Sequence, residues 1–383
     1  MTNQYIISDF DLFGGLHCET SAVRKVYLYN DLSISEELLF GLGGGIGFIY
    51  WYMKQMPAPM VGGRGGGRYF IEEAARRTKT SITIRRTSSS KKGHMWLLEK
   101  LRAQQPAVIY ADMAYLPYTG VPDDAHFGQH AFVVYGIDEE TNTVFISDRG
   151  QRGVTVTIEE LQRARASKFP PWPPQHALFD FKFPTKLEIT REGIMDALTA
   201  TVNGMVNPPI RNIGLKGIKK WSDLIVQWPK LFPVEKLGQA LQQGFIYIET
   251  GGTGGSAFRP MFARYLKEVH EHFPLTGLDA VISKYEESAR IWSEIAVRLL
   301  PDEYPNLRQV RKWILEQNRI GENQPPGALD RIHEINHKID ANIDQIMAEV
   351  AEAPVFLPRT QEWILQLYEV EREAIHLLQQ TIS

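Results

Sequence analysis

A thiol, an imidazole and a carboxylate in the N-terminal half are the side chains best suited to chemistry. Cys18 follows the tetrapeptide GGLH at 14–17 and is predicted to open a helix over 18–30. A helix N-terminus carries partial positive charge and free N–H groups, which favour a thiolate and can hold an oxyanion. The alternative is a small buried hydrophobic residue, because free cysteines are among the most buried residue types.

His130 and Asp148 are predicted to supply the base and its orienting group. His130 precedes the apolar segment 131–137, and Asp148 follows the apolar segment 144–147. The polar stretch 138–143 suits a hairpin loop, which would place the start of the first strand beside the end of the second. A cysteine nucleophile needs a base, and the base needs an orienter. The sequence therefore predicts a Cys18–His130–Asp148 triad; the alternative for the last two is a surface ion pair.

The elements around these residues mix helix and strand. Apolar runs rich in β-formers predict strands, and helical spacing or capping signals predict helices. The strands are expected at 107–110, 131–137, 144–147 and 154–158, and the helices at 18–30, 93–105, 159–166 and just after a capping box formed by Ser33 and Glu36.

A proline-rich segment divides the chain. Residues 168–175 hold four prolines and are predicted to form a stiff connector, followed by a short extended segment at 177–183. Beyond residue 188 the pattern is helical, with apolar stripes over 278–299, 328–350 and 361–380. The prediction is an α+β domain at 1–175, a connector at 176–187 and an all-α domain at 188–383.

Composition narrows the class of protein. The chain has 383 residues, 43% hydrophobic and 23% charged, with 42 Lys+Arg against 45 Asp+Glu, a net charge of −3 and one cysteine. This is globular composition without the excess of basic residues that nucleic-acid binding favours, and one thiol excludes an intrachain disulfide. Neither a membrane span nor a secretory signal is evident, so we expect a cytoplasmic protein with no membrane or nucleic-acid partner.

The order of these features resembles the papain-like fold, in particular its bacteriocin-processing peptidase branch. More narrowly, the chain is similar to the butirosin biosynthesis protein H family. That resemblance spans both halves of the chain and rests on these motifs: GLHCET at 15–20, SEE at 35–37 leading to FGLG at 40–43, Asp112 with YLPY at 115–118, HAF at 130–132, and GGTGGSAFR at 251–259.

The resemblance implies a cysteine acyltransferase of specialised metabolism, such as antibiotic biosynthesis. Cys18 would take an acyl or aminoacyl group from the phosphopantetheine thioester of an acyl carrier protein, and a small amine would then accept it. His130 would relay protons and Asp148 would orient it, with no resident cofactor or metal. Substrate-binding residues are expected among the matching motifs: His17, Glu19, Asp112, Tyr115, Tyr118 and Arg259.

Two other functions fit the same residues. The triad would also serve a cysteine hydrolase of the amidase or peptidase type, in which water replaces the amine. Alternatively, the fold would bind a ligand without catalysis, and Cys18 would be inert. The helical half would form the acceptor wall, dock the carrier or mediate a homodimer. Papain-like enzymes usually place an oxyanion-hole Gln six residues before the Cys, where this chain has Leu12. The oxyanion hole would therefore use the Cys18 N–H and one other donor, for which His17 and Gln4 are candidates.

Three further patterns leave alternatives open. The basic run from Arg76 to Lys92, which includes Arg77, Arg85 and Arg86, suits a docking patch for an acidic carrier protein or a solvated face. The motif HEINH at 333–337 matches a zinc-binding pattern, but an exposed charged helix face explains it better. The glycines at 251–255 lead into a helix whose N-terminus could bind an anion beside Arg259, or they simply connect two helices.

Overall fold

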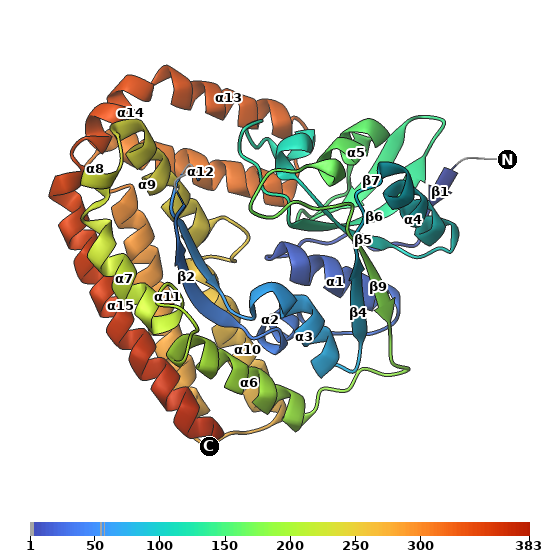
Figure 1. Ribbon diagram of the computed structural model, residues 1–383, viewed down its shortest axis with the longest axis horizontal. Helices are drawn as coiled ribbons and strands as arrows, with labels where there is room; N and C mark the ends of the chain where they lie inside the picture. The colour runs from blue at the N-terminus through green and yellow to red at the C-terminus, as the bar shows by residue number, and fades with distance from the viewer. Residues whose placement is uncertain (1–3, 54–55, 57) are drawn as a thin grey trace. The chain divides into compact units, whose positions relative to one another are not determined.

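The computed structural model describes residues 4–53, 56 and 58–383 and has a mixed α/β architecture, with a sheet in the N-terminal region and a helical C-terminal part. It divides into two compact units (Figure 1). The sheet unit comprises residues 1–36, 79–187 and 317–335, and the helical unit comprises 37–78, 188–316 and 336–383. Both units are thus discontinuous along the chain, whereas the sequence predicts contiguous domains. One of the boundaries between the units lies between residues 187 and 188, where the helical domain is predicted to begin.

The sheet unit is built on antiparallel strands in the order β4-β9-β5-β6-β7-β8, with β1 added beside β6. Their bounds are β1 (Gln4–Ile6), β4 (Ser81–Arg85), β5 (Ala107–Ala111), β6 (His130–Asp138), β7 (Thr143–Ser147), β8 (Val154–Thr157) and β9 (Leu178–Lys182). Strand β6 pairs with β5 along its first half and with β1 along its second. Because β6 has neighbours on both sides, eight of its nine residues are buried and it forms the core of the sheet.

The sheet is accompanied by the helices α1 (Cys18–Tyr29), α4 (Ser90–Arg102) and α5 (Ile158–Ala166), and residues 317–335 add further helical segments to the unit. Helix α1 packs against β6 and β5 (Figure 1), and its apolar residues Val23, Val26 and Tyr27 are almost completely buried. A capping box of Thr157 and Glu160 starts α5 directly after β8. These elements confirm the strands and helices predicted from the sequence between residues 90 and 166.

Two local features differ from their sequence interpretation. Residues 176–187, predicted as a connector, contain β9, which pairs with β4 and β5, so the sheet unit continues to Leu187. The extended segment predicted at 177–183 corresponds to this strand. Helix α2 (Glu36–Leu42) begins at Glu36, so the predicted capping box is wrong, because Glu36 is one of the first helical residues and its carboxylate binds elsewhere.

The helical unit surrounds a two-stranded sheet of β2 (Ile46–Trp51) and β3 (Met60–Arg64). Strand β2 packs against α7 and α6, and β3 packs against α9. The helices of the unit are α2, α3 (Phe70–Arg77), α6 (Arg191–Val206), α7 (Gly214–Ile225), α8 (Trp228–Leu231), α9 (Val234–Glu249), α10 (Arg259–His272), α11 (Leu278–Leu299), α14 (Ile343–Val350), α15 (Ala353–Ile382) and parts of α12 (Pro305–Asn323) and α13 (Ala328–Ala341).

The apolar stripes of the sequence explain the packing of these helices. In α11 all the stripe residues predicted from helical spacing are buried, and the helix packs against α15, α10 and α9. The stripe over 328–350 is divided between α13 and α14 at Asn342, which leaves Ile343 exposed. None of the helices in the described part of the chain is long and apolar enough to cross a membrane.

Candidate active site

Cys18 is the first residue of α1 and is partly exposed. His17 precedes it in an extended conformation and makes no side-chain cap, so no side chain of that residue covers the N–H groups of the first turn. The loop before the helix is held by the segment after β7. The Gly15 N–H donates to the Arg149 carbonyl at 2.9 Å, and the Arg149 guanidinium donates to the Leu16 carbonyl at 3.3 Å. These bonds fix the thiol at the start of the helix.

Glu36 supports the same loop from its other side. Its buried carboxylate accepts the Leu16 N–H at 3.0 Å, the His17 N–H at 2.8 Å and the Thr20 hydroxyl at 2.9 Å. Charge-assisted hydrogen bonds of this kind are stronger than neutral ones. Because two of the three donors are backbone groups just before Cys18, the carboxylate sets the path of the chain into Cys18.

His130 and Asp148 form a close pair, as the hairpin geometry predicts. Nε2 of His130 lies 2.6 Å from Oδ2 of Asp148, and their side chains are only 4% and 12% exposed. The register explains the contact, because Ser147 lies opposite Val133 and the next residue therefore leaves the sheet beside the start of β6. The Cys18 side chain lies close enough to the ring to help raise the His130 pKa. Since Nε2 is taken by the carboxylate, Nδ1 is the nitrogen that remains for the thiol.

Asp148 has two further hydrogen-bond partners that hold its carboxylate in place. The Tyr118 hydroxyl donates to Oδ2 at 2.8 Å, and the Arg149 N–H donates to Oδ1 at 2.7 Å. Both carboxylate oxygens are thus bound while one of them faces the imidazole. An orienting carboxylate needs such fixed geometry to select one tautomer of its histidine.

The pKa values of the pair show how the charges interact. Burial is the largest influence on His130 and would lower its pKa, but the charge and hydrogen bond of Asp148, together with Cys18, raise it to about 9. Burial would raise the pKa of Asp148, yet His130, Arg149 and Tyr118 hold it well below its ordinary value. Burial and the Asp148 charge raise the pKa of Tyr118. At neutral pH the pair is therefore an imidazolium and a carboxylate.

Lys25 adds a buried cation to this cluster. Its side chain donates to the Asp148 main-chain carbonyl and, at 3.0 Å, to the Ser21 hydroxyl. Its Nζ also lies 5.2 Å from the centre of the Phe13 ring. Only 2% of the residue is exposed. Burial, the largest influence, lowers its pKa to about 8, against the opposing charges of Asp148 and Glu36.

Two family models match successive parts of the chain, and the first covers all three residues of the predicted triad. Residues 17–149, which hold Cys18, His130 and Asp148, match the family described as butirosin biosynthesis protein H, N-terminal. The N-terminal part of the chain belongs to the butirosin biosynthesis protein H family. Residues 159–316 match a domain of unknown function, DUF4872. No curated protein matches the chain.

Most of the predicted substrate-binding residues of the butirosin biosynthesis protein H domain lie near the triad or support it. Tyr118 binds the carboxylate of Asp148, and His17 precedes the thiol with its Nδ1 3.2 Å from the Thr20 hydroxyl. Glu19 is buried in the first turn of α1, where it accepts a hydrogen bond from the Tyr110 hydroxyl. These contacts are positioning contacts, and binding of substrate by these side chains stays a prediction.

Asp112 and Tyr115 belong to the loop that follows β5. Asp112 is fully buried, and its carboxylate accepts from the Phe127 N–H at 3.1 Å and the Ser167 hydroxyl and contacts His126 Nδ1 at 2.9 Å. Ala111 lies opposite His130, so this loop starts at the end of the sheet that carries His130. Asp112 therefore anchors the loop that carries Tyr115 and Tyr118. Any direct contact of Tyr115 with substrate stays a prediction.

Arg259 has a different environment from the one its motif suggested. It is fully buried in the helical unit, where it is the first residue of α10. A guanidinium has five N–H donors, and all of them are used within the protein. Nε and Nη2 bind the Glu371 carboxylate at 2.7 and 3.1 Å, and Nη1 and Nη2 bind the carbonyls of Gly63, Ala257 and Gly47 at 2.8–2.9 Å. No donor is left over for a substrate anion, so the structure gives Arg259 a structural role.

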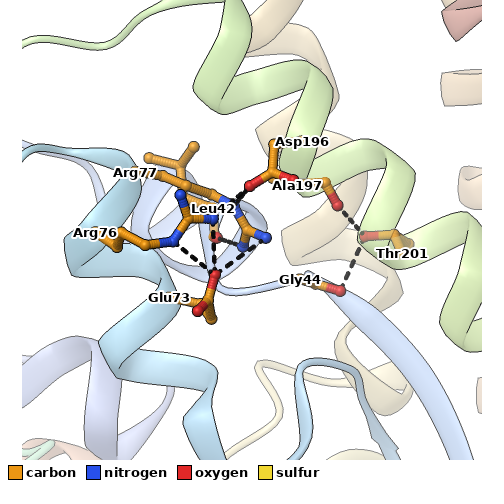
Figure 2. A network of polar contacts seen from close by, with 8 residues as sticks. All are labelled: Leu42, Gly44, Glu73, Arg76, Arg77, Asp196, Ala197 and Thr201. Atoms are coloured by element: carbon orange, nitrogen blue, oxygen red, sulfur yellow. Dashed lines mark hydrogen bonds and ion pairs between the residues drawn. The ribbon is translucent and has the colours of Figure 1, made fainter.

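The predicted basic docking patch is divided between the units. Arg76 and Arg77 lie in the helical unit and share the carboxylates of Glu73 and Asp196, as Figure 2 shows. Arg77 is buried, whereas the Arg76 side chain is 58% exposed.

Arg85 and Arg86 lie in the sheet unit, where Arg85 pairs with Asp180 and lies over the Trp96 ring at 4.5 Å. The guanidinium of Arg86 lies 6.0 Å from the centre of the Tyr110 ring. Arg86 is exposed. Of the four arginines, Arg76, Arg77 and Arg85 are therefore paired with carboxylates of the chain. Docking of a carrier protein on these residues stays a prediction.

The oxyanion-hole candidates separate clearly. Leu12 has an apolar, exposed side chain that cannot donate. Gln4 pairs with Asp138, at the end of β6 opposite to His130, and eight strand residues span about 26 Å. Gln4 is therefore too distant to assist the Cys18 N–H, and a role for His17, whose Nδ1 contacts the Thr20 hydroxyl, stays a prediction. The sequence did not indicate that Glu36 and Lys25 support the predicted triad. The described residues contain no group of His, Cys, Asp and Glu that could hold a metal ion.

Proposed function

We propose that this protein is a cysteine acyltransferase that moves an acyl or aminoacyl group from a carrier-protein thioester to an amine. The observation that carries the proposal is an imidazole that is bound to a carboxylate and interacts electrostatically with a thiol at a helix N-terminus. A base within reach of the nucleophile and an orienter on the base are the signature of covalent acyl transfer. The antiparallel sheet beside the Cys18 helix, with His130 and Asp148 at one end of it, supports a papain-like arrangement.

The first half of the reaction transfers the acyl group to the enzyme. The Cys18 thiolate attacks the thioester carbonyl, and the oxyanion that forms is held by the Cys18 N–H at the start of α1. The intermediate collapses, the bond to the carrier sulfur breaks, and the leaving thiolate takes the proton of the His130 imidazolium. The products are an acyl-enzyme thioester on Cys18, a neutral His130 and the free carrier thiol.

The second half transfers the acyl group to the amine. The amine attacks the carbonyl of the acyl-enzyme, and His130 takes a proton from the amine nitrogen as the tetrahedral intermediate forms. Collapse breaks the bond to the Cys18 sulfur, releases the amide and restores the thiolate–imidazolium pair. Asp148 keeps its proton-free state throughout and holds the ring. The name of the matched family, which refers to butirosin biosynthesis, supports a synthetic rather than a degradative reaction.

The test uses the fact that the chain has one cysteine. The protein is mixed with an acyl-pantetheine thioester, and intact mass spectrometry measures the adduct. We expect one adduct of the mass of the acyl group that hydroxylamine removes, and at least about 10³-fold slower formation in the Cys18→Ala variant. Equal adduct formation in Cys18→Ala would refute the assignment.

A second arm separates transfer from hydrolysis. The preformed acyl-enzyme is incubated with a panel of primary amines, and the products are measured as amide and free acid. An acyltransferase gives an amide fraction that rises with amine concentration. Free acid alone at every amine concentration would favour the hydrolase.

A further inference from the structure

Lys25 is a buried charged residue that the proposed reaction does not use. It lies seven residues after Cys18 on α1, and Ser21 lies between them, so the spacing of three and four places all three on one face of the helix. Lys25 is 2% exposed and is one of the largest fully enclosed side chains of the protein. Burial of an ammonium is unfavourable unless specific partners compensate for it.

Lys25 contacts the main chain of Asp148, the third residue of the predicted triad. Its ammonium group donates to the main-chain carbonyl of Asp148, whose carboxylate holds Nε2 of His130. Thus one side chain of the nucleophile helix binds the backbone of the residue that orients the base. The neighbouring Arg149 continues the connection, because its carbonyl accepts the Gly15 N–H in the loop before Cys18.

We propose that Lys25 is a positioning residue that fixes the main chain of Asp148 to the helix of Cys18, and so sets the contact between His130 and the thiol. This inference rests on the proposed function, since it assigns a role within the same site. The three triad residues come from α1, β6 and the segment after β7, and α1 lies far from the other two in the sequence. A bond between the first and the third of these elements fixes the geometry of the pair that both support.

The charges around Lys25 are consistent with a cation at neutral pH. The carboxylates of Asp148 and Glu36 favour its protonated form, and the guanidinium groups of Arg24 and Arg149 oppose it. Burial is the largest influence and lowers its pKa to about 8, so the ammonium persists at pH 7. A charged donor binds a carbonyl more strongly than a neutral one.

The test is the titration of the His130 imidazole by NMR in histidine-labelled full-length protein. His130→Gln assigns the resonance among the 10 histidines. Lys25→Met removes the donor and keeps the length of the side chain. We expect the His130 pKa, about 9 in the wild type, to fall by about one unit or more, because a displaced Asp148 no longer favours the imidazolium. Lys100→Met, which removes a lysine paired with Asp180, is the control and should leave His130 unchanged.

Two other results would overturn the inference. If Lys25 acted only as a nearby positive charge, its removal would raise the His130 pKa. If it were only structural, the thermal midpoint would fall and the His130 titration would stay in place. Lys25→Gln, which keeps a donor, serves if Lys25→Met does not fold, and should retain a raised His130 pKa. Because the titration needs no acyl substrate, a failure of acyl-enzyme formation with an intact Lys25 effect would refute the proposed function alone.

Discussion

The triad cluster of the sheet unit and the Arg259–Glu371 cluster of the helical unit are built from similar parts. Each holds a buried cationic side chain against a carboxylate with little or no exposure, with hydroxyl groups beside them. In the helical unit every guanidinium donor is bound, and the Glu371 carboxylate also accepts from Ser288 and Trp292. In the sheet unit the imidazole also interacts with a partly exposed thiol. The comparison shows that a buried ion pair becomes a candidate for chemistry only where a reactive group remains within its reach.

The largest effect should come from breaking the Arg259–Glu371 cluster of the helical unit. Arg259→Met leaves the Glu371 carboxylate buried without its cation, which costs about 3–5 kcal/mol in the free energy of unfolding. Denaturant titration measures the loss, and iodoacetamide alkylation of Cys18 in the folded protein should proceed at the wild-type rate. The exposed pair of Arg264 and Glu37 gives the matched control, because Arg264→Met should cost less than about 1 kcal/mol. A small loss in Arg259→Met would remove the distinction between the two clusters.

A substitution at Glu36 tests whether the triad cluster depends on the loop before Cys18 being held in place. Glu36→Ala leaves the Leu16 and His17 N–H groups without their acceptor, at about 1–3 kcal/mol. We also expect slower acylation of Cys18, because the chain before the thiol loses its anchor. Glu37→Ala, at the adjacent and more exposed position, should change neither quantity appreciably. Wild-type acylation in a destabilised Glu36→Ala protein would show that this carboxylate serves stability alone.

The pH dependence of stability isolates the charged pair. The folded-state pKa of His130 is raised from 6.5 to about 9, so its stabilising contribution is complete below about pH 6.5 and is lost as the pH rises through 9. Between pH 6.5 and 8 this group should lower the free energy of unfolding by up to about 1.4 kcal/mol per pH unit. The lysine at position 25 begins to titrate only near the upper end of this window. Subtracting the profile of His130→Gln from that of the wild type should reveal the slope; identical profiles would contradict a charged His130.

The smallest effect is expected at the exposed half of the Arg76–Arg77 pair. Arg76→Met removes an exposed ion pair and should cost no more than about 1 kcal/mol, whereas Arg77 is buried and binds the same carboxylates. Acylation from a small pantetheine thioester should be unchanged in Arg76→Met. A drop in acylation only when the acyl group is presented on an acidic carrier protein would support a docking role for this residue, and equal rates with both donors would argue against it.

The sequence predicted the parts of the site that depend on local pattern. The strand periodicity and the polar loop 138–143 were enough to place His130 beside Asp148, because an antiparallel hairpin has one geometry. The helical spacing after residue 17 was enough to place Cys18 at a helix start. What it could not show was which distant group binds a buried polar side chain. Glu36 had the spacing of a helix cap but binds a loop near residue 17, and Lys25 had no pattern of its own. Arg259 followed a glycine loop that suggested an anion site, and only its distant partner Glu371 shows that its donors are already used.

The rate of Cys18 alkylation by iodoacetamide against pH, in the wild type and in His130→Gln, tests the central claim most directly. If the imidazolium of His130 stabilises the thiolate, the wild type reacts rapidly already at pH 6–7, and the rate rises little above that range. The variant should react slowly there and follow an ordinary thiol, which titrates near about 8.5. Alkylation that rises steeply toward pH 9 in both proteins would contradict an activated Cys18–His130 pair and favour the non-catalytic alternative.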